Sequence, residues 1–194
     1  MIVTTQLPGT YREATGDRVD FQVALFEWEE AARPSLLSVA RHYHATVTYE
    51  ELAEEVQHLS GVRTRVLLPN WIGKVLGNVA VECHRRGEPL LSALCVHKNG
   101  TIGPGYADAV ADTYGGDPPA DLELHAGEER LRCHQYFHAL NLPAGGGIGA
   151  LTPQVAAQRS RARRKSGSHP YVLPKACPTH HLALLASGKC PVCG

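Results

Sequence analysis

The sequence has no apolar run approaching the ~18–20 residues that a membrane-spanning helix needs, so no transmembrane segment is expected. Residues 1–12 lack the basic and apolar regions of a secretory signal, which makes the cytoplasm the expected location. No local signature of a Ser/His/Asp triad, an H-N-H nuclease or a restriction-type nuclease occurs. We therefore assign no catalytic residue and expect no small-molecule cofactor. The hydrophobic content of 43% nevertheless excludes a wholly disordered chain.

Acidic residues are absent from the last third of the chain. All 19 Asp and Glu residues lie at or before Glu129, together with ten of the 19 Lys and Arg residues, so residues 1–129 carry a net charge of −9. Residues 130–194 contain nine Lys and Arg residues and carry +9. This division predicts a basic tail with an anionic partner, which is either nucleic acid or the chain's own acidic body.

Six cysteines are present, and without an expected signal peptide they do not indicate a disulfide framework. The last three occur in Cys177-Pro-Thr-His180 and Cys190-Pro-Val-Cys193, which nine residues separate. Such pairs have the spacing of a structural Zn2+ site, because each tight turn presents two soft ligands and two turns complete a tetrahedron. The segment resembles zinc-ribbon and treble-clef knuckles. His181 is an alternative to His180 as the fourth ligand.

The first half of the chain has helical periodicity. Asp20 to Tyr43 carries an apolar stripe, and Pro34 is expected to divide it into two helices or to open a second one. Thr48 and Glu51 have the spacing of a capping box at the start of the next helix. Asn70 is expected to cap a long amphipathic helix that follows a basic connector.

The second half of the chain changes character. Leu90 to Lys98 is an apolar run that predicts a strand, and Asn99-Gly100 is a strong hairpin signal. Residues 107–126 are acidic and rich in Gly and Pro, which favours a loop, and residues 127–140 are expected to be helical. Capped helix, turn, second helix, strand and hairpin follow one another as in a winged helix-turn-helix.

These patterns predict an α+β fold in which a helical body with a winged helix-turn-helix precedes a small zinc knuckle. The expected parts are a flexible arm (1–19), a helical and winged-helix domain (20–140), a Gly-rich and basic linker (141–170) and the zinc knuckle (171–194).

Four short motifs of residues 46–106 resemble the carboxyl-terminal domain of alkylguanine-DNA alkyltransferases and alkyltransferase-like proteins. They are Val47-Thr-Tyr-Glu-Glu-Leu-Ala53, Ile72-Gly-Lys-Val-Leu-Gly-Asn78, Pro89-Leu-Leu and Asn99-Gly-Thr-Ile-Gly-Pro-Gly-Tyr106. The resemblance implies a winged-helix fold and DNA binding. It does not extend to alkyl transfer, because the family's P-C-H-R nucleophile motif is replaced by Ser92-Ala-Leu-Cys-Val-His-Lys98. Cys83 and Cys95 lie in apolar patterns and are expected to be core residues.

The favoured function is therefore that of a non-enzymatic, zinc-containing DNA-binding protein. The long helix is expected to turn one polar face to solvent, with two arginines before its start, and the linker holds a run of cations. The expected DNA-contacting residues are Arg63, Arg65, Trp71, Lys74, Asn78, Arg159, Arg161, Arg163, Arg164 and Lys165. The alternative is a protein-interaction adaptor or inhibitor on the same scaffold, and a weaker one is an alkyltransferase-like or metal-dependent DNA-processing enzyme.

Overall fold

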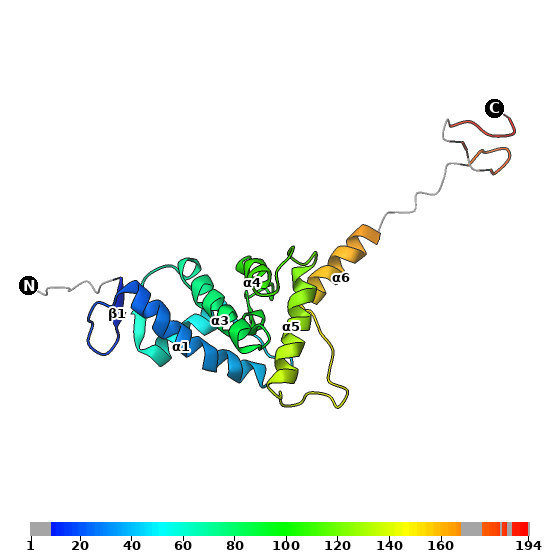
Figure 1. The fold of residues 1–194 in the computed structure, drawn as a ribbon. Helices are drawn as coiled ribbons and strands as arrows, with labels where there is room; N and C mark the ends of the chain where they lie inside the picture. The colour runs from blue at the N-terminus through cyan, green and yellow to red at the C-terminus, as the bar shows by residue number, and fades with distance from the viewer. Residues whose placement is uncertain (1–8, 168–175, 183, 186–187, 194) are drawn as a thin grey trace, which may run out of the picture. The chain divides into compact units, whose positions relative to one another are not determined.

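The structure is a computed structural model that describes residues 9–167, 176–182, 184–185 and 188–193 (Figure 1). It divides into two compact units, Met1–Ala157 and Gln158–Gly194. The described residues form six α-helices, short 3-10 segments and two small two-stranded sheets, so the α+β class is confirmed. Within these residues no helix is both long enough and apolar enough to cross a membrane.

Helix α1 (Phe21–Ala40) begins at Asp20, whose carboxylate accepts a hydrogen bond from the Gln22 amide. It runs unbroken through Pro34, so the prediction that this proline divides it was wrong. The buried face continues on both sides of the proline, with Trp28 before it and Leu36 after it both fully buried. Packing of that face against α2 (Tyr49–Ser60) and α3 (Ile72–Arg86) outweighs the one helical hydrogen bond that proline cannot make.

The capping box at the start of α2 is confirmed. The Thr48 hydroxyl accepts from the Glu51 amide at 3.2 Å, and the Glu51 carboxylate accepts from the Thr48 amide at 2.8 Å. Gly61 ends the helix in the left-handed region with a φ of 65°, a conformation that glycine adopts without strain.

Part of the expected amino-terminal arm is structured. Strand β1 (Thr10–Arg12) pairs antiparallel with β3 (Val62–Thr64), and the Arg12 guanidinium donates to both carboxylate oxygens of Glu27 at 2.6 and 2.9 Å. A three-residue strand is too short to produce a periodic pattern, so the sequence did not reveal it. Residues 1–8 of the predicted arm lie outside the described residues.

Helix α3 begins one residue later than expected. Asn70 belongs to the 3-10 helix η1 (Leu68–Asn70), and Trp71 occupies the N-cap position without a side-chain capping bond. Trp71 is only 2% exposed and lies against Trp28, with ring centroids 4.3 Å apart. The expectation that Trp71 faces solvent was therefore wrong, because a partner 43 positions earlier in the chain buries it.

The run after α3 is not a long strand. Residues Leu91–Leu94 form the 3-10 helix η2, and only Cys95–Val96 form a strand, β4, which pairs parallel with β2 (Val47–Thr48). The turn at Asn99-Gly100 closes with a bond from the His97 amide to the Thr101 carbonyl, but residues 101–104 form no returning strand. The winged helix-turn-helix is consequently not confirmed.

Two expected irregular regions contain helices. Helix α4 (Gly105–Tyr114) lies where a loop is expected, and it buries Tyr106 and Val110 on the side that packs against α3. Helix α5 (Leu122–Tyr136) begins within the same region and ends before residue 140. Helix α6 (Pro153–Gly167) lies where the basic linker is expected, with Thr152 and Pro153 as its start signal.

We expect Trp71→Ala to lower the free energy of unfolding by ~3–5 kcal/mol, because it removes a buried aromatic ring and leaves a cavity beside Trp28. Val81→Ala is the matched control, since Val81 lies on the same helix with 62% of its side chain exposed. Urea unfolding followed by far-UV circular dichroism measures both changes. A loss of less than about 1 kcal/mol for Trp71→Ala would contradict the packing described here.

Candidate metal centre and cationic surface

Two turns of the carboxyl-terminal unit bring four metal-binding side chains together. The ligand atoms of Cys177, His180, Cys190 and Cys193 all lie within 4.8 Å of one another. The Cys177 and Cys193 sulfurs are 3.8 Å apart, and each of the Cys177 and Cys190 sulfurs is 3.7 Å from His180 Nδ1. A tetrahedron with metal–sulfur bonds of ~2.3 Å and metal–nitrogen bonds of ~2.0–2.1 Å has edges of about 3.6–3.8 Å. These three separations therefore match the edges of a tetrahedral metal site.

Backbone hydrogen bonds close both turns. The His181 amide donates to the Cys177 carbonyl at 2.8 Å, and the Cys177 amide donates to the Leu182 carbonyl at 2.8 Å. In the second turn the Val192 amide donates to the Cys190 sulfur at 3.4 Å. Amide donation to a ligating sulfur favours its thiolate form, which is the form that binds metal.

The structure selects His180 over His181 as the fourth ligand. His180 belongs to the cluster of ligand atoms, whereas His181, whose φ of 53° lies in the left-handed region, does not. The turn thus brings the His180 imidazole to the Cys177 and Cys190 sulfurs.

The thiols of the cluster influence one another. The backbone N–H groups of His180 and Thr179 lower the pKa of Cys177 to about 6. Hydrogen bonds from Cys193 to the Cys190 and Cys177 sulfurs raise its pKa. Three thiolates and one imidazole would fill all four positions around a tetrahedral ion, as in structural metal sites, and would leave none for a catalytic water.

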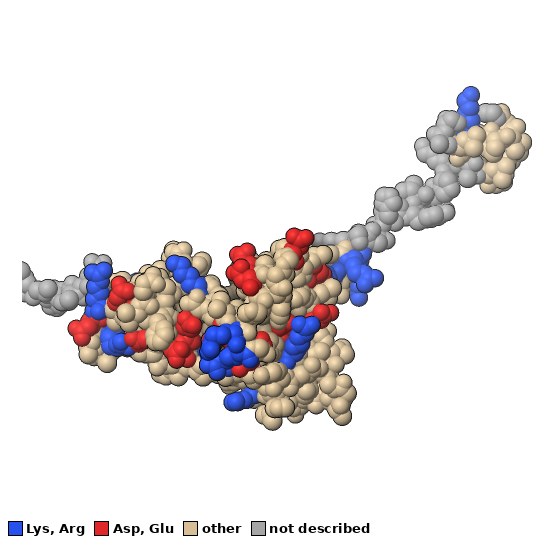
Figure 2. Space-filling view, viewed as in Figure 1, with Lys and Arg blue, Asp and Glu red and all other residues tan. Residues whose placement is uncertain are grey.

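The basic run of the sequence lies on α6. Arg161, Arg163 and Arg164 are exposed and Arg159 is partly buried, while the side chain of Lys165 lies outside the described part of the chain. Figure 2 shows the blue Lys and Arg side chains over this helix. The unit Gln158–Gly194 has seven Lys and Arg residues and no Asp or Glu, so its own side chains supply no carboxylate to neutralise them.

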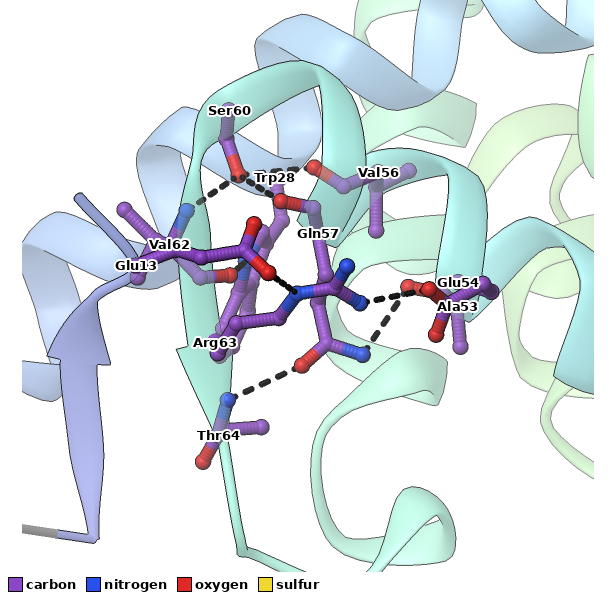
Figure 3. A network of polar contacts seen from close by, with 10 residues as sticks. All are labelled: Glu13, Trp28, Ala53, Glu54, Val56, Gln57, Ser60, Val62, Arg63 and Thr64. Carbon is purple, nitrogen blue, oxygen red and sulfur yellow. Dashed lines mark hydrogen bonds and ion pairs between the residues drawn. The ribbon is translucent and has the colours of Figure 1, made fainter. Parts of the chain in front are cut away.

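The predicted contact residues before α3 engage acidic groups of their own unit. The Arg63 guanidinium bonds Glu13 at 3.2 Å and Glu54 at 2.6 Å (Figure 3). Arg65 is exposed, and its amide donates to the Gly9 carbonyl at 2.7 Å. Arg63 therefore holds β3 to α2 and to the segment after β1.

The predicted contact residues of α3 do not form one open basic face. The Asn78 side-chain amide donates to Glu29 at 3.0 Å, and Lys74 Nζ lies 5.8 Å from the centre of the Phe21 ring. Trp71 is buried and so is not part of the exposed surface of α3. Lys74 and Asn78 already contact residues of α1.

The other three cysteines are core residues, as predicted for Cys83 and Cys95. Cys83, Cys95 and Cys133 are fully buried, and burial raises the pKa of each thiol. A nucleophilic cysteine requires an accessible thiolate, so the cysteines of the first unit do not fit alkyl transfer.

Comparisons of the chain with protein families, with curated proteins and with solved structures found no match. The resemblance of residues 46–106 to alkyltransferase domains thus has no support beyond its motifs. Any inference about function therefore rests on the cluster of candidate metal ligands between Cys177 and Cys193 and on the uneven distribution of charge along the chain.

We expect His180→Ala to weaken metal binding by at least about a hundredfold, because it opens one of four coordination positions. His181→Ala is the matched control and should change the affinity less than about threefold. Competition with a chromophoric chelator, together with elemental analysis of the full chain, measures affinity and stoichiometry. Equal losses in the two variants, or metal-free wild-type protein, would contradict this assignment.

Proposed function

We propose that this chain is a zinc-containing nucleic-acid-binding protein whose carboxyl-terminal unit contacts the phosphates of duplex DNA. The observation that carries the proposal is the composition of Gln158–Gly194, which combines seven cationic side chains with no Asp or Glu. Release of the counterions condensed on DNA makes such a segment bind duplexes without regard to sequence.

Zinc is the metal that this donor set favours. Thiolate and imidazole ligands in a closed tetrahedron are typical of structural zinc, whereas calcium and magnesium require oxygen ligands. The segment from Cys177 to Cys193 is too short to build a hydrophobic core, so metal binding would supply its folding free energy. The ion would thereby fix the end of a strongly basic segment.

The basic helix has suitable dimensions for a DNA groove. An α-helix with its side chains is ~10–12 Å across, and the major groove of B-DNA is ~12 Å wide. At about 100° per residue, Arg159 and Arg163 share one side of α6 while Arg161 and Arg164 project on others. Arginines on several sides of one helix can reach phosphates on both walls of a groove, which favours backbone contact over base recognition.

The first unit contributes less to this surface than the sequence predicts. Met1–Ala157 contains 12 Lys and Arg residues against all 19 acidic residues, so it carries a net charge of −7. Arg63 and Asn78 bond carboxylates of the same unit, which would have to be released before these side chains could bind phosphate. We therefore assign the main electrostatic contact to Arg159, Arg161, Arg163, Arg164 and Lys165.

A protein-interaction adaptor is the second candidate, and a surface of the first unit favours it. Phe26 and Leu59 are 63% and 53% exposed and line a shallow hollow of about 390 Å³ that also includes Glu27 and Glu30. Large apolar side chains with carboxylates around them are typical of surfaces that bind other proteins.

For the favoured function we expect wild-type protein to shift a labelled duplex at 50 mM salt and to lose affinity steeply by 200 mM, the ~50–200 mM range in which counterion release dominates. Replacing Arg159, Arg161, Arg163 and Arg164 together by Gln should lower the slope of log K against log salt by up to about 3.6. Gln preserves helix propensity, so α6 should persist.

The matched control replaces the same four arginines by Lys, which keeps the charge and should keep most of the slope. Equal slopes for the Gln and Lys variants would contradict the role of α6. Absence of any shift by wild-type protein at the lowest salt concentration would reject the nucleic-acid function and favour the adaptor.

A further inference from the structure

A pocket of about 280 Å³ lies within the first unit, at some distance along the chain from the metal cluster. Its walls come from the segment before β2, from α5, and from the segment that leads into α6. Gly127 allows the last of these to approach α5 closely, because a Cβ atom there would lie 2.7 Å from the Ala150 carbonyl oxygen. The pocket has the size of a site for a small ligand.

A buried guanidinium lines this pocket. Arg130 is 5% exposed, and its two terminal nitrogens donate to the Ala93 carbonyl at 3.3 Å and to the Ala150 carbonyl at 3.0 Å. No ion pair joins Arg130 to a carboxylate among the described residues, although the field of Glu123 reaches it. Arginine retains its charge in proteins, so a nearly uncompensated cation is buried here.

A second buried side chain at the pocket has one ring nitrogen without a hydrogen-bond partner among the described residues. His134 is 2% exposed, and its Nδ1 lies 2.9 Å from the Ala40 carbonyl oxygen, while its Nε2 has no hydrogen-bond partner. Buried polar atoms of native proteins are nearly always satisfied by protein, water or ligand. An unpartnered imidazole nitrogen beside a buried guanidinium therefore indicates that the pocket holds a polar ligand.

The remaining lining favours a negative charge. No Asp or Glu lines the pocket, whereas His44 does, together with Thr152 and Pro153 at the start of α6. The amino-terminal end of a helix carries a partial positive charge that favours anions. The guanidinium and the helix end thus both favour an anion. Because His134 Nδ1 donates to the Ala40 carbonyl, Nε2 of the neutral ring is an acceptor, which suits a protonated oxygen of a hydrogen phosphate.

We propose that this pocket binds a phosphate-type oxyanion, with Arg130 as the principal charge partner. The pocket lies wholly in the first unit, so the proposal does not depend on DNA binding by α6. A free phosphate ion and the terminal phosphate of a nucleotide or oligonucleotide share this chemistry. A phosphate monoester also has room for a small organic group in the cavity.

The test titrates inorganic phosphate into the full chain at constant ionic strength by calorimetry, with amide chemical shifts followed by NMR. We expect one site per chain in the first unit, and perturbation of the amides of Ala150 and Thr152. Thr46 is an exposed lining residue, so Thr46→Glu places a carboxylate at the pocket without altering the core. It should weaken phosphate binding at least about tenfold, while the neutral control Thr46→Gln should stay within about threefold.

A second pair of variants, at His44, tests the proposal independently in case the Thr46 variants misfold. His44 has a φ of 66°, which Asp and Asn both tolerate, so His44→Asp should weaken binding and His44→Asn should weaken it much less. Comparing inorganic phosphate with 5′-phosphorylated and 5′-hydroxyl oligonucleotides then distinguishes the two sources of the anion. Shifts confined to residues 158–194, or equal affinities for the acidic and neutral variants of both pairs, would overturn the proposal.

Discussion

The first unit depends on how it satisfies the backbone of a segment that crosses its core. Leu90, Leu91 and Leu94 are fully buried among α1, α3 and α5, where irregular backbone cannot reach water. Side chains of α5 replace the water, since Glu129 accepts from the Leu90 amide at 2.8 Å and Arg130 donates to the Ala93 carbonyl. An apolar segment without regular backbone hydrogen bonding therefore requires charged side chains on the buried face of α5. The same contacts hold the middle of α5 against η2.

This arrangement gives different partners to the two buried charged side chains of α5, Glu129 and Arg130. Glu129 is fully engaged, because Tyr114 donates to it at 2.7 Å and Arg132 lies 3.1 Å from its other oxygen. Among the described residues Arg130 bonds only the carbonyl oxygens of Ala93 and Ala150, so no carboxylate pairs with its charge and a ligand can do so. The proposed oxyanion site is therefore a consequence of the same constraint that builds the core, and not a separate addition to the surface.

The carboxyl-terminal unit follows a different physical rule. Its described residues form no hydrophobic cluster comparable to that of the first unit, and its sequence has seven Lys and Arg residues and no Asp or Glu. A metal ion bound by Cys177, His180, Cys190 and Cys193 would supply local order in a segment of this length, and the proposed anionic partner would reduce the repulsion between its cations. The acidic first unit and the basic second unit would then have separate tasks, with phosphate contact concentrated in α6.

Sequence alone determined the features that depend on neighbours along the chain. The metal ligands, the capping box of Thr48 and Glu51 and the division of charge are local, because tight turns and helix starts are defined within a few residues. Tertiary structure decided the rest. Trp71 is buried against Trp28, a contact that the local sequence does not specify. The apolar run after Leu90 forms a 3-10 helix, and a segment that is buried on all sides has the same apolar sequence pattern whether it is a strand or a helix. Arg130 and His134 form a pocket only because the Ala150 segment folds back onto α5, and no local pattern specifies a contact between such distant residues.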